Sequence, residues 1–135
     1  MIRRRFLVFG LLIAFCATLA QPAGAGYRGR WVLLGERVVT DRLDHDTIVV
    51  TGLRGFFRGI EIRVLDRAVQ FHDVKIRFAN GDDQDVAIRD VIPAGGASRV
   101  IDIPGNRRVI RSIDFWYDAQ SIRGRTARVR VFGVR

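Results

Sequence analysis

The chain contains one cysteine, Cys16, and it lies in the N-terminal segment, ahead of the small residues 23–25 (Ala-Gly-Ala) that are typical of a signal-peptidase site. Cleavage after Ala25 leaves a chain without any thiol. Disulfides, thiolate metal sites and cysteine nucleophiles are then excluded. Phe15 stands before Cys16, where lipoprotein processing requires a small residue, so we do not expect lipidation.

Long apolar runs are also scarce, because the only one extends from Phe6 to about Ala20. Arginines at 3–5 precede it, which completes the three-part pattern of a secretory signal peptide. The run is shorter than the roughly 20 residues that a helix needs to cross a bilayer. We therefore predict a signal peptide at 1–25, a single domain at 26–135, a periplasmic or secreted location, and no stable membrane span after cleavage.

Lysine is nearly absent, since Lys75 is the only one, and arginine supplies almost all of the positive charge. Of the 23 basic residues three precede residue 26, which leaves 20 against 14 acidic residues and a net charge of +6. Arginine suits planar anions such as phosphate, sulfate and carboxylate. A genome with GC-rich codons would produce the same excess, so the charge does not by itself define a ligand site.

Amphipathic helices and internal repeats are missing after the leader, and the pattern there alternates with period two. Ile60, Ile62 and Val64 alternate with Glu61 and Arg63, which is typical of strands with one face in a core and one in water. The same pattern predicts eight strands, at 31–39, 46–51, 58–65, 73–79, 84–89, 99–103, 109–117 and 127–133. The expected fold is all-β, an antiparallel β-sandwich of jelly-roll or Greek-key type, with a small closed barrel as the alternative.

The acidic segment NGDDQD at 80–85 follows one of these strands, and the register across it can be deduced. A two-residue loop at Asn80 and Gly81 would turn Asp83 and Asp85 into the core, at a large cost in desolvation. A loop with an odd number of residues avoids this. We therefore predict a three- or five-residue loop that pairs residue 79 with 83, with Gly81 at positive φ and with Asp82 and Asp83 at the tip.

The same acidic segment raises the question of a metal. Calcium needs six to eight oxygen ligands, and the helix-loop-helix calcium pattern requires a glycine where Asp85 stands. We expect no metal and no cofactor. The alternative is calcium held by Asp82, Asp83 and Asp85 together with a second loop, such as the one that contains Asp44 and Asp46.

Catalytic patterns are equally sparse. His45 lies between Asp44 and Asp46, but neighbours on a strand point to opposite faces, and His72 is the only other histidine. These do not fit a structural zinc site. None of the serines that follow residue 25 lies in a nucleophile elbow, and we find no phosphate-binding glycine loop. We predict that the protein is not an enzyme, and a hydrolase using Asp44, Asp46 and Asp114 is the least favoured alternative.

The most informative residues are aromatic. In the strand at 109–117 the alternation directs Ile113, Phe115 and Tyr117 inward, and Ser112, Asp114 and Trp116 outward. An outward tryptophan offers a stacking surface for a sugar ring or for a partner's side chain. The alternative is that a loop such as 52–59 covers Trp116. The candidate ligand-binding residues are Trp116, Arg111, Arg125, Arg128 and Arg130.

The C-terminal third contains two recurring patterns. Arg108, Ile110, Ile113 and Phe115 form R-x-I-x-x-I-x-F, and Ala127, Val129, Val131 and Gly133 form A-x-V-x-V-x-G. These patterns resemble those of small exported bacterial proteins of unknown function. They also resemble, more distantly, the jelly-roll sandwiches of carbohydrate-binding and discoidin-like modules. The resemblance implies a β-sandwich, and it transfers no binding or catalytic residue.

The function that these observations favour is that of an exported, non-enzymatic binding module. Its expected ligand is an anionic or saccharide component of the cell envelope, an envelope polyanion or polysaccharide. The alternative is a structural or assembly protein that binds an envelope protein. Nucleic acid is not expected as a partner, because export separates the chain from the genome.

Overall fold

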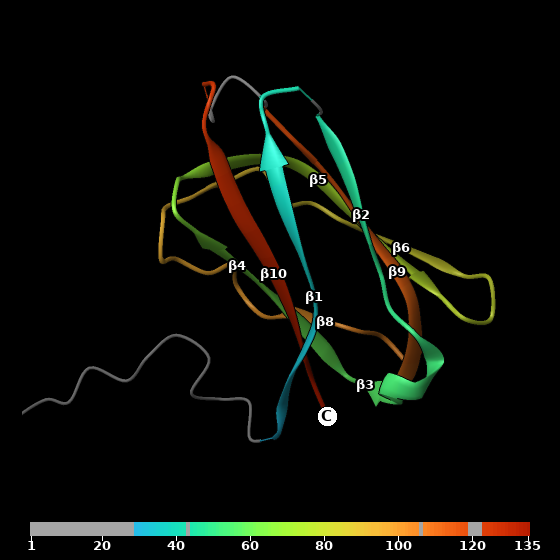
Figure 1. Cartoon of the computed structure of the whole chain (residues 1–135). Helices are drawn as coiled ribbons and strands as arrows, with labels where there is room; N and C mark the ends of the chain where they lie inside the picture. The colour runs from blue at the N-terminus through green and yellow to red at the C-terminus, as the bar shows by residue number, and fades with distance from the viewer. Residues whose placement is uncertain (1–28, 43, 106, 119–122) are drawn as a thin grey trace, which may run out of the picture.

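The structure is a computed structural model that describes residues 29–42, 44–105, 107–118 and 123–135 (Figure 1). Within them the regular structure is β, apart from one short 3-10 turn. The predicted signal peptide at 1–25, with Cys16, lies outside the described residues and stays a prediction.

Two antiparallel sheets form the sandwich. The smaller, here called the β10 sheet, has the order β1 (Trp31–Thr40), β10 (Thr126–Val134), β4 (Gly59–Leu65), β8 (Ile101–Asp102). The larger, the β9 sheet, has the order β2 (His45–Val49), β9 (Arg108–Tyr117), β5 (Val69–Phe78), β6 (Asp83–Val86). In addition, β3 (Phe56–Phe57) pairs with β9, β7 (Val91–Ile92) pairs with β5, and the 3-10 turn η1 (Gly52–Arg54) precedes β3.

The chain passes repeatedly from one sheet to the other, as from β1 to β2, from β4 to β5 and from β9 to β10. Such crossings are expected in jelly-roll and Greek-key sandwiches. At one edge, Nε of Arg37 on β1 donates to the carbonyl oxygen of Thr47 on β2 over 2.8 Å and so joins the two sheets. The prediction of an all-β antiparallel sandwich is confirmed.

The core lies between the sheets and is formed by the inner positions of the alternating strands. The predicted inward residues of β9 are all buried, with Phe115 packed edge-on against Phe71 at 6.1 Å between ring centroids. The remaining inner positions are likewise nearly free of solvent; they include Ile60, Ile62, Val64, Val74, Ile76, Phe78, Val129 and Val131. Removing this apolar surface from water is the main favourable term in folding.

Several strand bounds differ from the prediction. β5 starts at Val69 rather than at 73, because an irregularity in its pairing with β9 between Phe71 and Asp73 interrupts the alternation. β6 ends at Val86, and β8 has only two residues. The two-residue strands β3 and β7 were not predicted, because so short a strand has no periodicity of its own.

Glu61 is an exception to the simple alternation of β4. Its position predicts exposure, yet only 7% of the residue is exposed. Nε of Arg63 donates to Oε1 of Glu61 over 2.7 Å, and the same guanidinium lies 4.1 Å from the ring centroid of Phe132. The Arg63 side chain therefore covers both Glu61 and Phe132 on the outer side of the β10 sheet.

Candidate functional site

The acidic loop has the odd length that the sequence predicts. The amide of Phe78 donates to the carbonyl oxygen of Asp82 over 2.9 Å, so three residues, 79–81, form the turn between β5 and β6. Gly81 has a φ of +95°, a conformation that glycine adopts without strain. Both parts of this prediction are confirmed.

The register beyond the loop differs from the prediction by two residues. Val74 pairs with Val86 and Ile76 with Gln84, so residue 79 does not pair with 83. A shift of two keeps every side chain on its predicted face, which is why the alternation could not distinguish the two registers. Asp83 consequently lies inside β6 and not at the tip.

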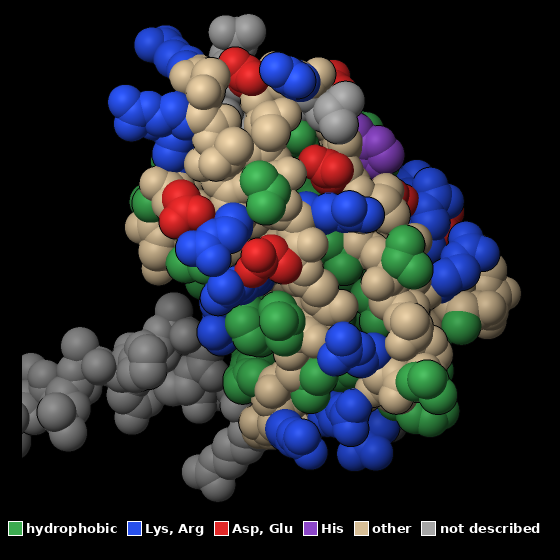
Figure 2. Space-filling view, in the orientation of Figure 1, with side chains coloured by type: hydrophobic (Ala, Val, Ile, Leu, Met, Phe, Trp, Pro, Cys, Tyr) green, Lys and Arg blue, Asp and Glu red, His purple; other side chains and the backbone are tan. Residues whose placement is uncertain are grey.

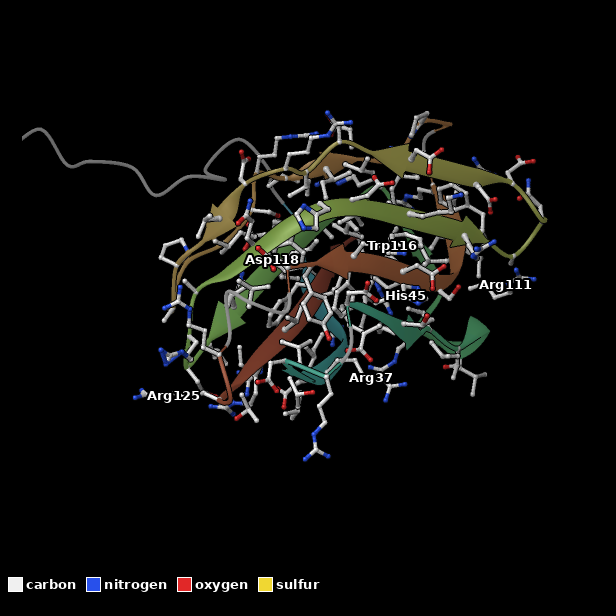
Figure 3. The ribbon with its side chains drawn as sticks, turned by 90° about the horizontal axis from the view of Figure 1, so that it is seen from above. Arg37, His45, Arg111, Trp116, Asp118 and Arg125 are labelled. Carbon is white, nitrogen blue, oxygen red and sulfur yellow. The ribbon has the colours of Figure 1, made fainter. Side chains whose placement is uncertain are left out.

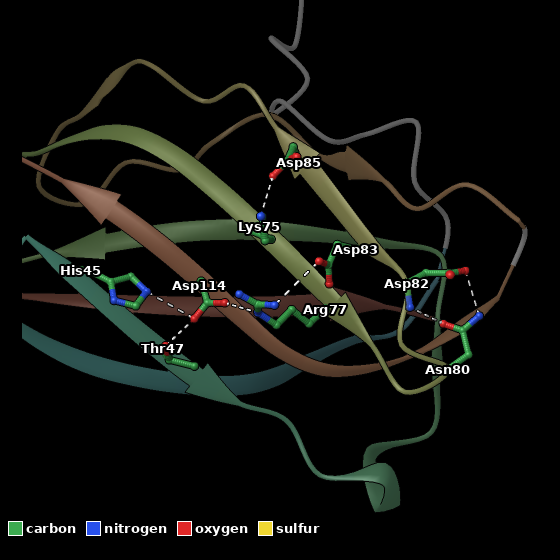
Figure 4. Close-up of polar contacts among 9 residues, drawn as sticks. All are labelled: His45, Thr47, Lys75, Arg77, Asn80, Asp82, Asp83, Asp85 and Asp114. Atoms are coloured by element: carbon green, nitrogen blue, oxygen red, sulfur yellow. Dashed lines mark hydrogen bonds and ion pairs between the residues drawn. The ribbon is translucent and has the colours of Figure 1, made fainter.

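Each of the three acidic candidates for a metal site lies beside a basic side chain, and Figure 4 shows the pairs of Asp83 and Asp85. Asp82 pairs with Arg108 at 2.8 Å, Asp83 with Arg77 at 3.7 Å, and Asp85 with Lys75 at 3.5 Å. A hydrogen bond from Asn80 and the pairing with Arg108 lower the pKa of Asp82. Within the described ranges, no group of three or more His, Cys, Asp or Glu side chains is placed to hold a metal ion.

Trp116 lies on the outer side of the β9 sheet, as predicted, and is partly exposed. Its cover is not the loop at 52–59. The imidazole of His45, its partner across β2 and β9, stacks on the indole with 4.6 Å between centroids and 20° between planes (Figure 3). The pair forms a short aromatic ridge, and 43% of the His45 side chain is exposed.

Asp114 lies two residues before Trp116 and fixes the position of this ridge. Its carboxylate accepts hydrogen bonds from the Thr47 hydroxyl and from Nε of Arg77, the latter at 2.7 Å (Figure 4). Nε2 of His45 lies 3.4 Å from Oδ1 of Asp114. Burial raises the pKa of Asp114, but the hydrogen bonds from Thr47 and Arg77 and the charge of Arg77 outweigh it, so the pKa lies below its ordinary value.

Charges on this outer face balance one another from strand to strand. Lys75 and Arg77 on β5 lie between Asp114 on β9 and the acidic residues of β6. Because an ammonium has three N–H donors and a guanidinium five, their ion pairs leave further donors for a ligand. We define the outer face as His45, Thr47, Lys75, Arg77, Asp114 and Trp116.

Arg128 and Arg130 do not join this face. Both belong to β10, in the other sheet, and they alternate there with buried Ala127 and Val129, so they lie on the opposite side of the sandwich. Arg128 forms hydrogen bonds to both carboxylate oxygens of Asp66, at 2.8 and 3.2 Å, and these lower the pKa of Asp66. Arg130 donates to Glu36. The predicted surface that combines Trp116 with Arg128 and Arg130 is therefore wrong.

The other two predicted arginines are also separated. Arg111 is exposed on β9, and its carbonyl oxygen accepts a hydrogen bond from the amide of Val50. Arg125 is exposed just before β10 begins. Figure 3 shows the two at opposite ends of the molecule, so one ligand of moderate size cannot contact both.

The acids considered for a hydrolase do not converge either. Asp46 pairs across the strands with buried Phe115 and lies on the inner side of the β9 sheet, where it accepts a hydrogen bond of 3.1 Å from the Tyr117 hydroxyl. Burial and the nearby Asp46 raise the pKa of Tyr117. Asp114 lies on the outer side, because strand neighbours alternate in direction.

The network around Asp114 was not predicted as a unit. Asp114 and Trp116 carried a signal, since both are outward positions of the predicted strand at 109–117, whereas His45 lies just before the predicted strand at 46–51. The missing information was the pairing of β2 with β9, which sets His45 opposite Trp116 and Thr47 opposite Asp114. Alternation along one strand does not reveal the partner strand.

The fold and this site show that the chain is a small antiparallel β-sandwich with an ordered polar outer face. The chain belongs to the family described as a domain of unknown function, DUF2541, whose model matches residues 6–133. This confirms the coarser part of the predicted resemblance, a family of unknown function.

One solved structure similar to this chain is that of AlgX from Pseudomonas aeruginosa, with a TM-score of 0.53 and 15% sequence identity. The match covers 82% of this chain and 27% of the AlgX chain, so this chain corresponds to about a quarter of that protein's length. At this identity the likeness supports the fold alone. A search of curated proteins found no match. In the described part of the chain, no helix is long and apolar enough to cross a membrane.

Proposed function

We propose that this protein is an exported, non-enzymatic binding module of the cell envelope whose ligand is a saccharide. The observation that carries the proposal is the stack of His45 on Trp116, beside a carboxylate that three side chains hold in place. A sugar ring presents C–H groups on one face and hydroxyls around its rim. The exposed part of the His45 and Trp116 ridge offers aromatic surface to the first, and fixed donors and acceptors bind the second.

Rigidity favours this face as a binding surface. Asp114 is 5% exposed and has Thr47, Arg77 and His45 around it, so its position changes little when a ligand arrives. Side chains that are already ordered lose less conformational entropy on binding. Lys75 and Arg77 supply the donors that remain for sugar hydroxyls.

A neutral saccharide fits this face better than an anion does. The cations of the face, Lys75 and Arg77, already pair with Asp85, Asp83 and Asp114, and an anion would have to compete with those carboxylates. Asp114 is a weak base, because the hydrogen bonds from Thr47 and Arg77 and the charge of Arg77 lower its pKa, so it is poorly suited to activate the Thr47 hydroxyl as a nucleophile. This favours binding over hydrolysis.

Affinity electrophoresis through neutral and acidic envelope polysaccharides tests the proposal. We expect retardation by a neutral polysaccharide, a loss of about tenfold in affinity for Trp116→Ala, and little dependence on salt. Arg128→Ala is the matched control, because it removes a large exposed side chain from the opposite side. Equal retardation of Trp116→Ala and the unmodified chain would reject the proposal.

A further inference from the structure

One end of the sandwich presents apolar side chains to solvent, and the proposed saccharide site does not use them. Leu53 in η1 is 97% exposed, Val49 at the end of β2 is 68% exposed, and Phe56 in β3 is 59% exposed. We call these three residues the tip. Apolar side chains exposed together at one end of a folded domain suggest an interaction surface.

The exposure of the tip is built into the fold. β3 pairs with β9, so Phe57 turns into the core, where it packs on Gly133, and Phe56 turns outward. Gly55, with a φ of +85°, ends the 3-10 turn and leaves Leu53 at its outermost point. The Arg54 guanidinium donates to the carbonyl oxygen of Leu33 over 3.1 Å, which fixes the turn against β1.

Arginines outnumber acidic residues around the tip. The segments 29–33, 49–58, 107–112 and 133–135 contain no Asp or Glu. Their arginines are Arg30, Arg54, Arg58, Arg107, Arg108, Arg111 and Arg135. Two acids lie beside these segments, Asp82, which pairs with Arg108, and Asp102, which pairs across the strands with Gly59. In Figure 2 the lower end, where Figure 1 draws β3 and η1, has blue and green side chains and no red.

Five lysine and arginine side chains elsewhere in the sandwich pair with acids among the described residues, and several arginines at the tip do not. Arg54 and Arg135 donate to backbone carbonyl oxygens, of Leu33 and Arg54 respectively. Arg111 is exposed and, among the described residues, forms no ion pair. Arg108, in contrast, pairs with Asp82. The tip therefore keeps positive charge that a negative surface can neutralise.

We infer that the tip docks the protein onto an anionic lipid surface. Leu53 and Phe56 would enter the boundary between headgroups and acyl chains, and the surrounding arginines would meet lipid phosphates. The apolar residues are outermost and the cations surround them, so the apolar residues would reach the acyl chains while the cations stay at the level of the phosphates. A protein partner would instead need a pocket for Leu53, which is 97% exposed.

The C-terminal arginine also lies at the tip. β1 begins at this end, with Trp31 paired to Val134 and Val134 paired to Gly59. Arg135, at the end of the chain, is located there as well (Figure 1).

Vesicle co-sedimentation tests the inference with the chain from Gly26 onward, which contains every described strand and core residue. Phosphatidylcholine vesicles with and without phosphatidylglycerol are compared. We expect binding only when phosphatidylglycerol is present, with a decrease at high salt. Leu53→Asp and Phe56→Ser should each reduce binding about tenfold or more, because both remove apolar contact with the bilayer.

Val38→Asp and Val91→Asp are the matched controls, since these valines are 56% and 58% exposed at other places on the surface. Unchanged binding in both controls supports the tip. Absence of binding to the anionic vesicles, or an equal loss in Leu53→Asp and Val38→Asp, overturns the inference. Capture of an acidic protein through Leu53 without any vesicle binding also overturns it. Trp116→Ala should bind vesicles normally, so this result is independent of the saccharide proposal.

Discussion

Nε of Arg77 on β5 lies 2.7 Å from Oδ2 of Asp114 on β9, across the middle of the outer face. Asp114 is one of three buried polar or charged residues in the described part of the chain, with Glu61 and Ser112. A buried carboxylate is tolerated when donors satisfy it, and here Thr47 and Arg77 do so. The carboxylate lies 3.4 Å from Nε2 of His45, and His45 in turn stacks on Trp116.

Asp114 should make the free energy of unfolding depend on pH in the acidic range. Its pKa in the fold lies below the roughly 3.9 of an unfolded chain, so its contribution is present above about pH 4 and is lost as pH falls through the folded pKa. We expect Asp114→Asn to lower the free energy of unfolding at neutral pH by about 1–3 kcal/mol and to flatten the acid limb. Urea unfolding from pH 7 to pH 2 measures both effects.

Asp83→Asn is the control for this prediction. Asp83 also faces Arg77, at 3.7 Å, but its side chain is 41% exposed. Exposed pairs contribute little, so the change should stay within about 0.5 kcal/mol. Equal effects of the two substitutions would show that Asp114 has no special position in the network.

Gly81 should be sensitive to a side chain. It has a φ of +95°, although a Cβ there would have open space around it. Strain alone predicts a loss of about 1 kcal/mol for Gly81→Ala. Gly52→Ala is the control, because Gly52 also has open space but no positive φ. Thermal melts of both variants measure the difference, and equal melting temperatures would argue against the three-residue turn.

Calcium should leave the melting temperature unchanged. A ligand that binds only the native state must raise it, but Asp82, Asp83 and Asp85 already lie beside Arg108, Arg77 and Lys75. Calcium would have to replace these ion pairs and still find further oxygen ligands. A rise in melting temperature that depends on calcium concentration, and that Asp82→Asn abolishes, would restore the acidic loop as a metal site.

Arg128→Ala and Arg130→Ala should retain polysaccharide binding. Both side chains lie on the outer side of the β10 sheet, where Asp66 and Glu36 are their partners. Loss of such exposed pairs should change stability by less than about 1 kcal/mol. The polysaccharide affinity of each variant is the measurement. A strong loss would place the ligand on the opposite side from Trp116.

The sequence predicts which way a side chain points better than it predicts what that side chain meets. The period-two pattern correctly places Trp116 outward and Tyr117 inward, and it correctly requires an odd loop at Gly81. It does not determine whether a strand lies in the β9 or the β10 sheet. For this reason Arg130 and Trp116, both outward, were assigned to one surface although they lie on opposite sides.

Cross-strand pairing also explains the other differences. Glu61 has an outward position in β4, yet Arg63 covers it. Phe57 is buried and Phe56 is exposed, because a two-residue strand can turn only one of two adjacent side chains inward. The sequence of 52–59 does not show which of the two phenylalanines faces the core, so the tip was not predictable from it.

The most direct test of the saccharide proposal uses the fluorescence of Trp116. The chain has two tryptophans, so Trp31→Phe leaves Trp116 as the only one. Fragments of a neutral envelope polysaccharide are titrated into this variant. The proposal predicts a saturable blue shift of the emission that His45→Ala weakens and Arg128→Ala leaves intact. An emission spectrum that no neutral or acidic fragment changes would contradict it.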